Sequence, residues 1–264
     1  MFDEWLAALE GRHLADLRVP EVTRALRALS SAYVERRRRS GPDARASQNV
    51  HGTLDSAGKR AAFALFYGPL HFLAADHVVR ALGAHLPPPS SVLDVGCGTG
   101  AAGAAWALAA GDVPISGIDR HPWAVEEARW TYRQFGLHGH ARTGDVSKLP
   151  ALRPGSGVLA AYVLNELPEM ARQRAEHALL SAAGRGVRVL ILEPIARAVT
   201  PWWDETAERV RAAGGRADEW RFAVDLPPFL RLMDKAAGLD HREITARSLY
   251  CFEPAKAGPH APPT

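Results

Sequence analysis

Cysteine and lysine are scarce in this chain, and long apolar runs are missing. Its 264 residues include only two cysteines, Cys97 and Cys251, which cannot form a zinc site by themselves. His138 and His140 have no carboxylate or thiol close by in the sequence, so we interpret both as surface histidines and expect no metal. No apolar run approaches the roughly 20 residues that span a bilayer, and we expect no membrane as a partner.

The N-terminal residues do not have the composition of a targeting segment. Asp3, Glu4 and Glu10 lie within the first ten residues, whereas a secretory signal starts with positive charge and a transit peptide is poor in acids. The expected location is therefore cytoplasmic. A disulfide is not expected in that compartment.

Positive charge is concentrated near the N-terminus. The net charge is +3, and the excess lies in the first 89 residues, where the run Arg36–Arg39 stands out. Such a basic cluster can bind the phosphates of nucleic acid. Because a Ser-Gly-Pro sequence follows at once, we favour the alternative that the run is the solvated end of a helix, where cationic side chains are favourable.

Two kinds of pattern divide the chain. Apolar residues recur at spacings of three and four over residues 1–35, and the pattern resumes from Gly58 to Tyr67 and, after Gly68-Pro69, from Leu70 to Leu86; this predicts helices. Pro87–Pro89 then form a linker. From residue 90, strands and helices alternate, which predicts a parallel sheet. We therefore expect a helical extension, or lid, over residues 1–89, one α/β domain over residues 90–257 and a flexible tail over residues 258–264.

The α/β domain is predicted in detail as follows. The predicted strands are Ser91–Val95, Pro114–Ile118, Gly139–Thr143, Gly157–Val163, Val187–Leu192 and a final strand-rich segment, Arg242–Phe252. The predicted helices are Ala101–Ala110, Trp123–Phe135, Ala171–Ala183, Trp202–Ala213 and Pro228–Ala237. The pattern does not decide whether Glu219–Val224 pairs with this sheet as a strand or belongs to an insertion.

The most informative segment is Val92–Gly100, in which an apolar strand carrying Asp94 leads into three glycines spaced two apart. Glycines let the backbone approach a ligand, and the first N–H groups of the following helix point toward that ligand. The spacing of Gly98, Gly100 and Gly103 also fits the dinucleotide fingerprint. A carboxylate at Asp94 would repel the pyrophosphate of a dinucleotide, which favours a cofactor with a cationic group.

These motifs resemble those of the class I S-adenosylmethionine-dependent methyltransferases. The resemblance implies an α/β fold with a doubly wound, mostly parallel sheet of the Rossmann-like, seven-stranded type, and S-adenosyl-L-methionine as the cofactor. It also implies that Asp94 holds the methionine ammonium group, that Asp119 accepts both ribose hydroxyls, and that Asp145 accepts a hydrogen bond from the adenine amine. The other predicted cofactor-binding residues are Gly96, Cys97, Gly98, Gly100, Arg120, Val146 and Tyr162.

The candidate catalytic residues follow the fourth and fifth predicted strands. Asn165 or Glu166 would orient an acceptor or hold a water, although Glu166 also suits the start of the next helix. Glu193 would be a general base if burial raises its pKa, or it would pair with an arginine, since unpaired buried charge is costly. His71 lies in the aromatic segment Tyr67–Phe72. We expect residues 58–86 to close over the cofactor cleft and to form part of the acceptor pocket.

Missing motifs narrow the choice of methyl acceptor. The Asn/Asp-Pro-Pro-aromatic tetrapeptide of nucleobase amine methyltransferases is absent, and neither cysteine lies at the end of the fourth or fifth strand, as cytosine C5 methylation requires. Four lysines in the whole chain make the lysine-containing tetrad of 2′-O RNA methylation implausible. The nearly neutral α/β domain favours a methyltransferase that acts on a small molecule.

A second resemblance gives the alternative. Residues 162–167, Tyr-Val-Leu-Asn-Glu-Leu, and residues 192–194, Leu-Glu-Pro, are similar to methyltransferase-like proteins of small-ribosomal-subunit assembly, over about residues 58–195. The cysteine cluster usual in that group is absent, so no metal or iron–sulfur site is implied. This similarity implies an RNA- or ribosome-associated assembly factor in which the cofactor is structural, with RNA or the small subunit as partner.

Overall fold

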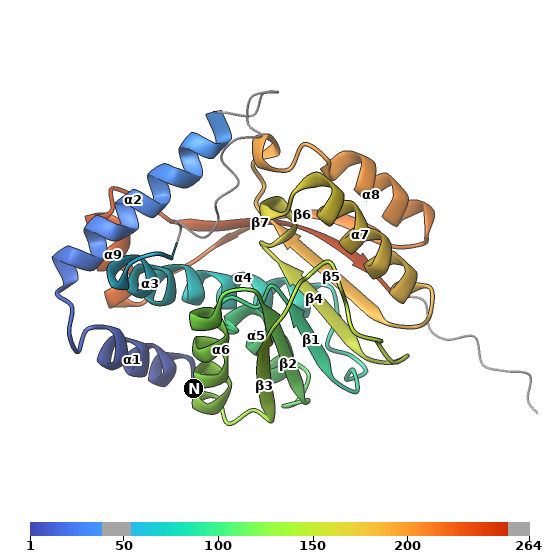
Figure 1. Cartoon of the computed structure of the whole chain (residues 1–264), viewed down its shortest axis with the longest axis horizontal. Helices are drawn as coiled ribbons and strands as arrows, with labels where there is room; N and C mark the ends of the chain where they lie inside the picture. The colour runs from blue at the N-terminus through green and yellow to red at the C-terminus, as the bar shows by residue number, and fades with distance from the viewer. Residues whose placement is uncertain (39–53, 253–264) are drawn as a thin grey trace, which may run out of the picture.

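A seven-stranded sheet crosses the molecule (Figure 1), in the order β3-β2-β1-β4-β5-β7-β6. The computed structural model describes residues 1–38 and 54–252, with side chains for residues 1–31 and 54–252. Strands β1 to β5 are parallel, β7 is antiparallel to β5, and β6 is antiparallel to β7. The strands are β1 (Val92–Val95), β2 (Ile115–Asp119), β3 (Gly139–Thr143), β4 (Gly157–Ala161), β5 (Arg188–Glu193), β6 (Arg216–Ala223) and β7 (Glu243–Cys251).

Helices cover both faces of this sheet, which confirms the doubly wound α/β fold. Alternate residues of a strand point to opposite faces, so Val92 belongs to one core cluster and Leu93 to the other. Strands β4 and β5 are buried along their length, as central parallel strands are. The first core contains α5 (Ala101–Ala109) and α6 (Pro122–Gln134), and the second contains α7 (Glu169–Ala183) and α8 (Trp203–Ala212).

The predicted elements of the α/β domain agree with the structure to within two residues at each end. The segment Glu219–Val224, which the sequence pattern did not assign, belongs to the sheet. Most of it lies in the edge strand β6, which pairs with β7. This strand is only half buried, and its mixture of charged and aromatic residues gave no continuous apolar signal. Helix α9 (Pro228–Ala236) connects the two antiparallel strands.

The N-terminal extension shares the first core with α5 and α6 instead of forming a separate one. Its helix over residues 57–81 packs along α5, and the buried ring of Trp5 lies against Phe72 and Phe135. The extension consists of α1 (Phe2–His13), α2 (Val19–Arg38), α3 (Ala57–Ala62), the π-helical turn η3 (Phe63–Tyr67) and α4 (Gly68–Ala81).

The expected interruption at Gly68-Pro69 is wrong, because the helix runs continuously from Ala57 to Ala81. The π-helical turn η3 ends at Tyr67, two residues before Pro69, and changes the hydrogen-bonding pattern there. Pro69 therefore falls in the first turn of α4, where its missing N–H is tolerated. The helix also ends before the predicted Leu86, and Gly83 has a positive φ of 66° just beyond that end.

This continuous helix has a second consequence. Among the described residues, Ala57–Ala81 is long and apolar enough to cross a membrane by length and composition, with a mean hydropathy of 1.2. The expectation that no apolar run reaches that length is wrong by this measure. These values describe an 18-residue stretch of the helix, and 67% of that stretch is buried inside the protein. The core helix of a globular fold is buried in the same way.

Two other expectations concern the ends of the described segments. The tail over residues 258–264 lies outside the described residues. Of the run Arg36–Arg39, the structure describes the backbone of the first three residues as the end of α2, whereas Arg39 and all four side chains lie outside the description.

The cysteines and histidines named above lie apart in the described part of the chain. Cys97 and Cys251 are free thiols, and both are buried. His138 and His140 are exposed. Over residues 1–38 and 54–252, no group of three His, Cys, Asp or Glu side chains is arranged to hold a metal ion.

Candidate functional site

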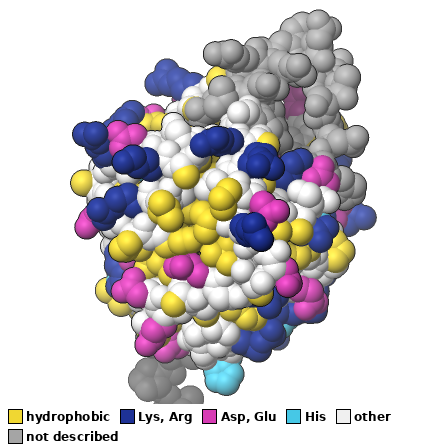
Figure 2. All heavy atoms as spheres, turned by 90° about the vertical axis from the view of Figure 1, so that its left-hand side faces the viewer, with side chains coloured by type: hydrophobic (Ala, Val, Ile, Leu, Met, Phe, Trp, Pro, Cys, Tyr) yellow, Lys and Arg dark blue, Asp and Glu magenta, His cyan; other side chains and the backbone are white. Residues whose placement is uncertain are grey.

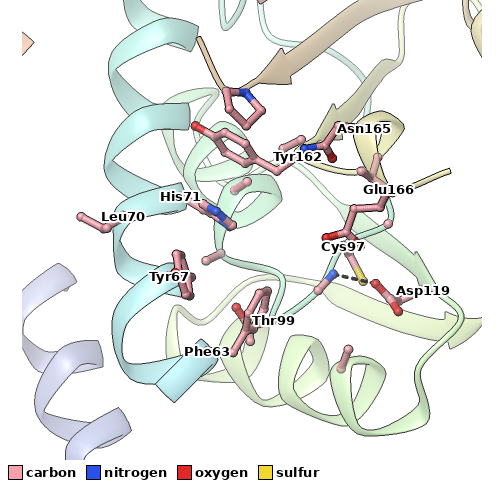
Figure 3. A pocket seen from close by; sticks show the side chains of 18 of the residues that line it. Phe63, Tyr67, Leu70, His71, Cys97, Thr99, Asp119, Tyr162, Asn165 and Glu166 are labelled. Atoms are coloured by element: carbon pink, nitrogen blue, oxygen red, sulfur yellow. Dashed lines mark hydrogen bonds between the residues drawn. The ribbon is translucent and has the colours of Figure 1, made fainter. Parts of the chain in front are cut away.

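A cavity of about 460 Å³ lies at the carboxyl ends of β1, β2 and β4 (Figure 3). One wall is formed by the glycine turn after β1 and by the loops after β2 and β4. The opposite wall is the helical segment η3–α4 of the extension. Open parallel sheets bind their ligands in this crevice, and the volume is in the range of pockets for small organic ligands.

In the turn after β1, glycines expose the backbone to the cavity. Gly96 and Gly98 have φ values of 69° and 51°, a conformation that favours glycine. A Cβ atom on Gly96 would lie 2.3 Å from Cγ2 of Val163, so the loop after β4 approaches the turn very closely. A Cβ atom on Gly68 would lie 3.1 Å from Oγ1 of Thr99. The turn is therefore held between the β4 loop and the extension.

Two other residues of the turn have different surroundings. Cys97 lines the cavity, and burial raises the pKa of its thiol well above the usual value, so the thiol is uncharged. Gly100 is not among the lining residues. It caps the start of α5 with φ of 77°, and a Cβ atom there would lie 2.8 Å from Cε1 of Tyr132. Glycine at this position allows α5 to pack closely against α6.

Asp94 lines the cavity from β1 and is only 1% exposed. Its Oδ2 accepts a hydrogen bond of 3.1 Å from the backbone N–H of Gly103, in the first turn of α5. A Cβ atom at Gly103 would lie 2.4 Å from that oxygen, so only glycine permits this contact. Burial raises the pKa of Asp94 to about 7, and the charge of Asp119 adds to the shift while the Gly103 N–H opposes it. A cation in the cavity would favour the ionised form.

Asp119 lies at the end of β2 and faces the glycine turn (Figure 3). Its Oδ2 accepts from the N–H of Gly98 at 2.9 Å, and its Oδ1 accepts from the N–H of His121 at 2.8 Å. Each carboxylate oxygen has a second lone pair, so both can still accept from a ligand hydroxyl. Arg120, the next residue, also lines the cavity.

Asp145 and Val146 differ in their access to the cavity. The Asp145 side chain is exposed and accepts from the backbone N–H and the hydroxyl of Ser147, at 2.9 and 2.8 Å. These hydrogen bonds lower the pKa of Asp145. Asp145 is not among the lining residues, whereas Val146 is. The proposed contact of Asp145 with adenine stays a prediction.

His71 and Tyr162 join the two walls. Their rings stack with centroids 4.2 Å apart and planes inclined by 17° (Figure 3). Tyr162 has a φ of 57°, uncommon for a residue other than glycine. Burial lowers the pKa of His71 to about 4 and raises the pKa of Tyr162 above its usual value. Both rings are therefore uncharged at neutral pH.

Asn165 and Glu166 also line the cavity, on the side opposite η3–α4 (Figure 3). They belong to a short 3₁₀-helix, η4 (Leu164–Glu166), directly after the β4 loop. The Asn165 side-chain oxygen is buried and has no hydrogen-bond partner among the described residues. A buried acceptor of this kind is available to a ligand donor.

Glu193 is fully buried and is not among the lining residues. Its Oε1 accepts from the backbone N–H groups of Leu164 and Asn165, at 2.9 and 3.2 Å. Burial raises its pKa well above the usual value. Arg247 lies opposite on β7, but its guanidinium donates to the carbonyls of Pro194 and the following residue. Among the described residues, Glu193 therefore positions η4 without forming an ion pair.

The sequence analysis missed the part of the cavity formed by the chain between α9 and β7. His241 lines this part and bonds to Asp234 of α9. No sequence signal identifies this pair, because it depends on how the turn after α9 folds back toward η3. The other lining residues not identified from the sequence include Phe63, Phe66, Leu70, Thr99, Pro194, Leu239, Ile244 and Thr245.

Comparisons with known proteins agree with this geometry. Residues 92–185 match the family model described as a methyltransferase domain. A search of curated proteins gives no match. An O-methyltransferase family protein from Burkholderia thailandensis has a similar structure, with 18% identity, 76% of this chain and 61% of that chain covered, and a TM-score of 0.52.

A second similar structure is magnesium protoporphyrin IX methyltransferase from Synechocystis PCC 6803 with bound S-adenosylmethionine, at 19% identity, 70% and 80% coverage, and a TM-score of 0.47. The similarity to the Burkholderia structure supports the α/β fold. The family match identifies residues 92–185 of this chain as a methyltransferase domain.

Proposed function

We propose that this protein binds S-adenosylmethionine in the cavity and transfers the methyl group to a small acceptor that carries no phosphate. The supporting observation is the charge of the cavity wall. Among the described residues, it contains three carboxylates, Asp94, Asp119 and Glu166, and a single Lys or Arg side chain, Arg120. A phosphate-rich acceptor would need more cations in this wall.

The residues present fit S-adenosylmethionine. Gly96 and Gly98 leave the backbone free of side chains where a ligand approaches. Asp94 provides a buried carboxylate for the ammonium group, and Asp119 provides acceptors for the ribose hydroxyls. When bound, the cofactor supplies an electrophilic methyl group on a sulfonium sulfur. A dinucleotide is disfavoured because Asp94 would repel its pyrophosphate.

The extension contributes aromatic groups to the same cavity. Tyr67 and His71 approach from one wall and Tyr162 from the other (Figure 3). Aromatic faces attract a cation, and uncharged rings exclude water from the reacting groups. Holding two reactants in one orientation is the main contribution that an enzyme makes to such a displacement. This placement supports a role for the extension in forming the acceptor pocket.

The face of the molecule in Figure 2 carries charged side chains of both signs. It includes α1, α2 and α9, where Lys, Arg, Asp and Glu side chains are interspersed around an apolar area. Binding to a phosphate backbone uses clustered cations on one face. Because the cavity wall has three carboxylates and one Arg among the described residues, we place the ribosome-associated alternative second.

The test is incubation of the full chain and methyl-labelled cofactor with cell extract, followed by separation of RNA, protein and small molecules. We expect label in the small-molecule fraction. Asp119→Ala is the control, because it removes the acceptor for the ribose and should reduce the label when the cofactor is below saturation. Label in the RNA fraction would support the ribosomal alternative. No label in any fraction, together with co-sedimentation with ribosomal subunits, would contradict an enzymatic role.

A further inference from the structure

The cavity extends beyond the predicted cofactor-binding residues to a second end near the turn after α9. This end is lined by Phe66 of η3 and by Leu239, His241 and Ile244. We propose that His241, oriented by Asp234, accepts the proton of a hydroxyl group on the methyl acceptor, and that the acceptor is an uncharged aromatic molecule bearing that hydroxyl. The inference rests on the proposed function and names its class of substrate.

Asp234 holds His241 in one orientation. Asp234 is only 5% exposed, and its two oxygens bond the same residue. Oδ1 lies 2.5 Å from Nδ1 of His241, and Oδ2 accepts from the His241 backbone N–H at 2.8 Å. The carboxylate therefore fixes both the backbone and the ring of His241. Asp234 is a positioning residue, since it does not line the cavity.

This geometry selects one tautomer of the His241 ring. An ionised carboxylate only accepts hydrogen bonds, so in the neutral imidazole the proton lies on Nδ1 and Nε2 carries a lone pair. Nε2 of His241 has no hydrogen-bond partner among the described residues. The side chain is 35% exposed and lines the cavity. These are the requirements for a general base whose ring is oriented by a carboxylate.

The wall around His241 is apolar and aromatic. The ring of Phe66 lies edge-on to His241 with centroids 5.8 Å apart, and Leu239 and Ile244 are apolar neighbours in the lining. No Lys or Arg from this part of the described chain lines the cavity, so an anionic acceptor would lack a counter-ion. The rings further along the wall, including Tyr67, favour a flat aromatic body.

The proposed step conserves atoms and charge. The acceptor oxygen forms a bond to the transferred methyl carbon, while its O–H proton moves to Nε2 of His241. The carbon–sulfur bond breaks, and its electron pair stays on sulfur. The positive charge thus passes from the sulfonium to the imidazolium, which the Asp234 carboxylate stabilises. An aromatic hydroxyl suits this base, because a phenol is much more acidic than an aliphatic alcohol.

The test measures binding rather than turnover. The full chain is saturated with S-adenosylhomocysteine, and the affinities of 2-naphthol and 2-fluoronaphthalene are compared by equilibrium dialysis. The two probes have nearly the same shape, but only the first has a hydroxyl donor. One hydrogen bond to Nε2 should make 2-naphthol bind about three- to tenfold more tightly. Equal affinities, no saturable binding of 2-naphthol, or tighter binding of 2-naphthyl phosphate would overturn the proposal.

Two variants locate the hydrogen bond. His241→Phe keeps an aromatic ring beside Phe66 and should abolish the preference for 2-naphthol, with the affinity for 2-fluoronaphthalene unchanged. His138→Phe, at an exposed position outside the cavity, should leave the preference intact. A preference that persists in His241→Phe would overturn the role of His241. Each variant is compared only where its affinity for S-adenosylhomocysteine matches that of the wild type.

The positioning role of Asp234 is tested through the tautomer. Asp234→Asn keeps a side-chain oxygen for the His241 N–H, but its amide N–H₂ would face Nδ1 and favour the proton on Nε2. The ¹⁵N shifts of the His241 ring should report Nδ1–H in the wild type and Nε2–H in the variant. An unchanged tautomer would overturn the role of Asp234. Failure of the wild type to bind S-adenosylhomocysteine would instead contradict the proposed function itself.

Discussion

Cofactor affinity should depend on pH through a single buried carboxylate. Burial, with the charge of Asp119 as a second cause, raises the pKa of Asp94 to about 7 in the ligand-free protein. A cationic ligand binds only the ionised form of Asp94 with its full affinity. The α-amino group of S-adenosylhomocysteine stays protonated below about pH 7.5, so between pH 5.5 and 7 the carboxyl is the group that changes.

The size of this effect follows from the ionised fraction of Asp94. With a pKa of about 7, roughly half of the carboxyl is ionised at pH 7 and about 3% at pH 5.5. The apparent dissociation constant should therefore be about 15-fold weaker at pH 5.5, which corresponds to about 1.6 kcal/mol. Calorimetry of S-adenosylhomocysteine binding at several pH values measures this slope directly.

Asp94→Asn is the matched variant, because an amide oxygen can still accept from the Gly103 N–H while the charge is lost. We expect weaker binding with no slope between pH 5.5 and 7. A slope in the variant equal to that of the wild type would refute the reasoning. So would a change of less than about threefold in the wild type.

The same ionisation affects folding with a defined sign. Because the pKa of Asp94 is raised in the folded protein, the native state binds this proton more tightly than the unfolded state does. The stabilisation is complete below the unfolded pKa of about 4 and is lost as the pH rises through about 7. Without ligand, Asp94→Asn should therefore be more stable than the wild type at pH 8, by up to about 4 kcal/mol.

Two further predictions concern stability, measured by urea denaturation. Gly96→Ala should cost about 2–5 kcal/mol, since its Cβ would lie 2.3 Å from Cγ2 of Val163 at a positive φ; the control Gly111→Ala has a positive φ but nothing within 4 Å and should cost only about 1–2 kcal/mol. Equal costs would contradict the close approach of the β4 loop. Glu193→Gln should change stability by less than about 1 kcal/mol, because its amide oxygen can still accept from the Leu164 and Asn165 N–H groups, whereas Glu193→Ala leaves these two N–H groups without that acceptor and should cost about 2–5 kcal/mol. Equal losses for both variants would show that the charge of Glu193 matters.

The cofactor side of the cavity was predictable because its determinants are local. The strand, the glycine turn and the following helix lie within about twenty consecutive residues, and backbone geometry alone requires glycine at Gly96 and Gly98. Asp119 was predictable for a related reason, since a residue at the carboxyl end of a parallel strand faces the crevice. The parallel sheet was predictable from the alternation of strands and helices.

Side-chain direction was not predictable. Asp145 and Val146 are neighbours in the sequence, yet only Val146 lines the cavity. Glu193 ends a strand, as Asp119 does, but it points to the backbone of η4 and is not among the lining residues. These differences depend on the conformation of the loops. Loops lack the regular spacing of apolar residues that identifies helices and strands in a sequence.

The acceptor end was hidden for a different reason. It joins Phe66 of the extension to His241, which is far away in the sequence. The position of His241 depends on the turn after α9 and on its two hydrogen bonds with Asp234. Tertiary packing creates this end of the cavity, so a reading of local patterns finds no trace of it.

The most direct test of the central claim is a comparison of two ligands by calorimetry on the full chain. We predict saturable binding of S-adenosylhomocysteine and no binding of NAD, because Asp94 attracts an ammonium group and repels a pyrophosphate. Asp119→Ala should weaken the binding of S-adenosylhomocysteine about tenfold or more, which corresponds to about 1.4 kcal/mol. Binding of NAD without binding of S-adenosylhomocysteine would contradict the account.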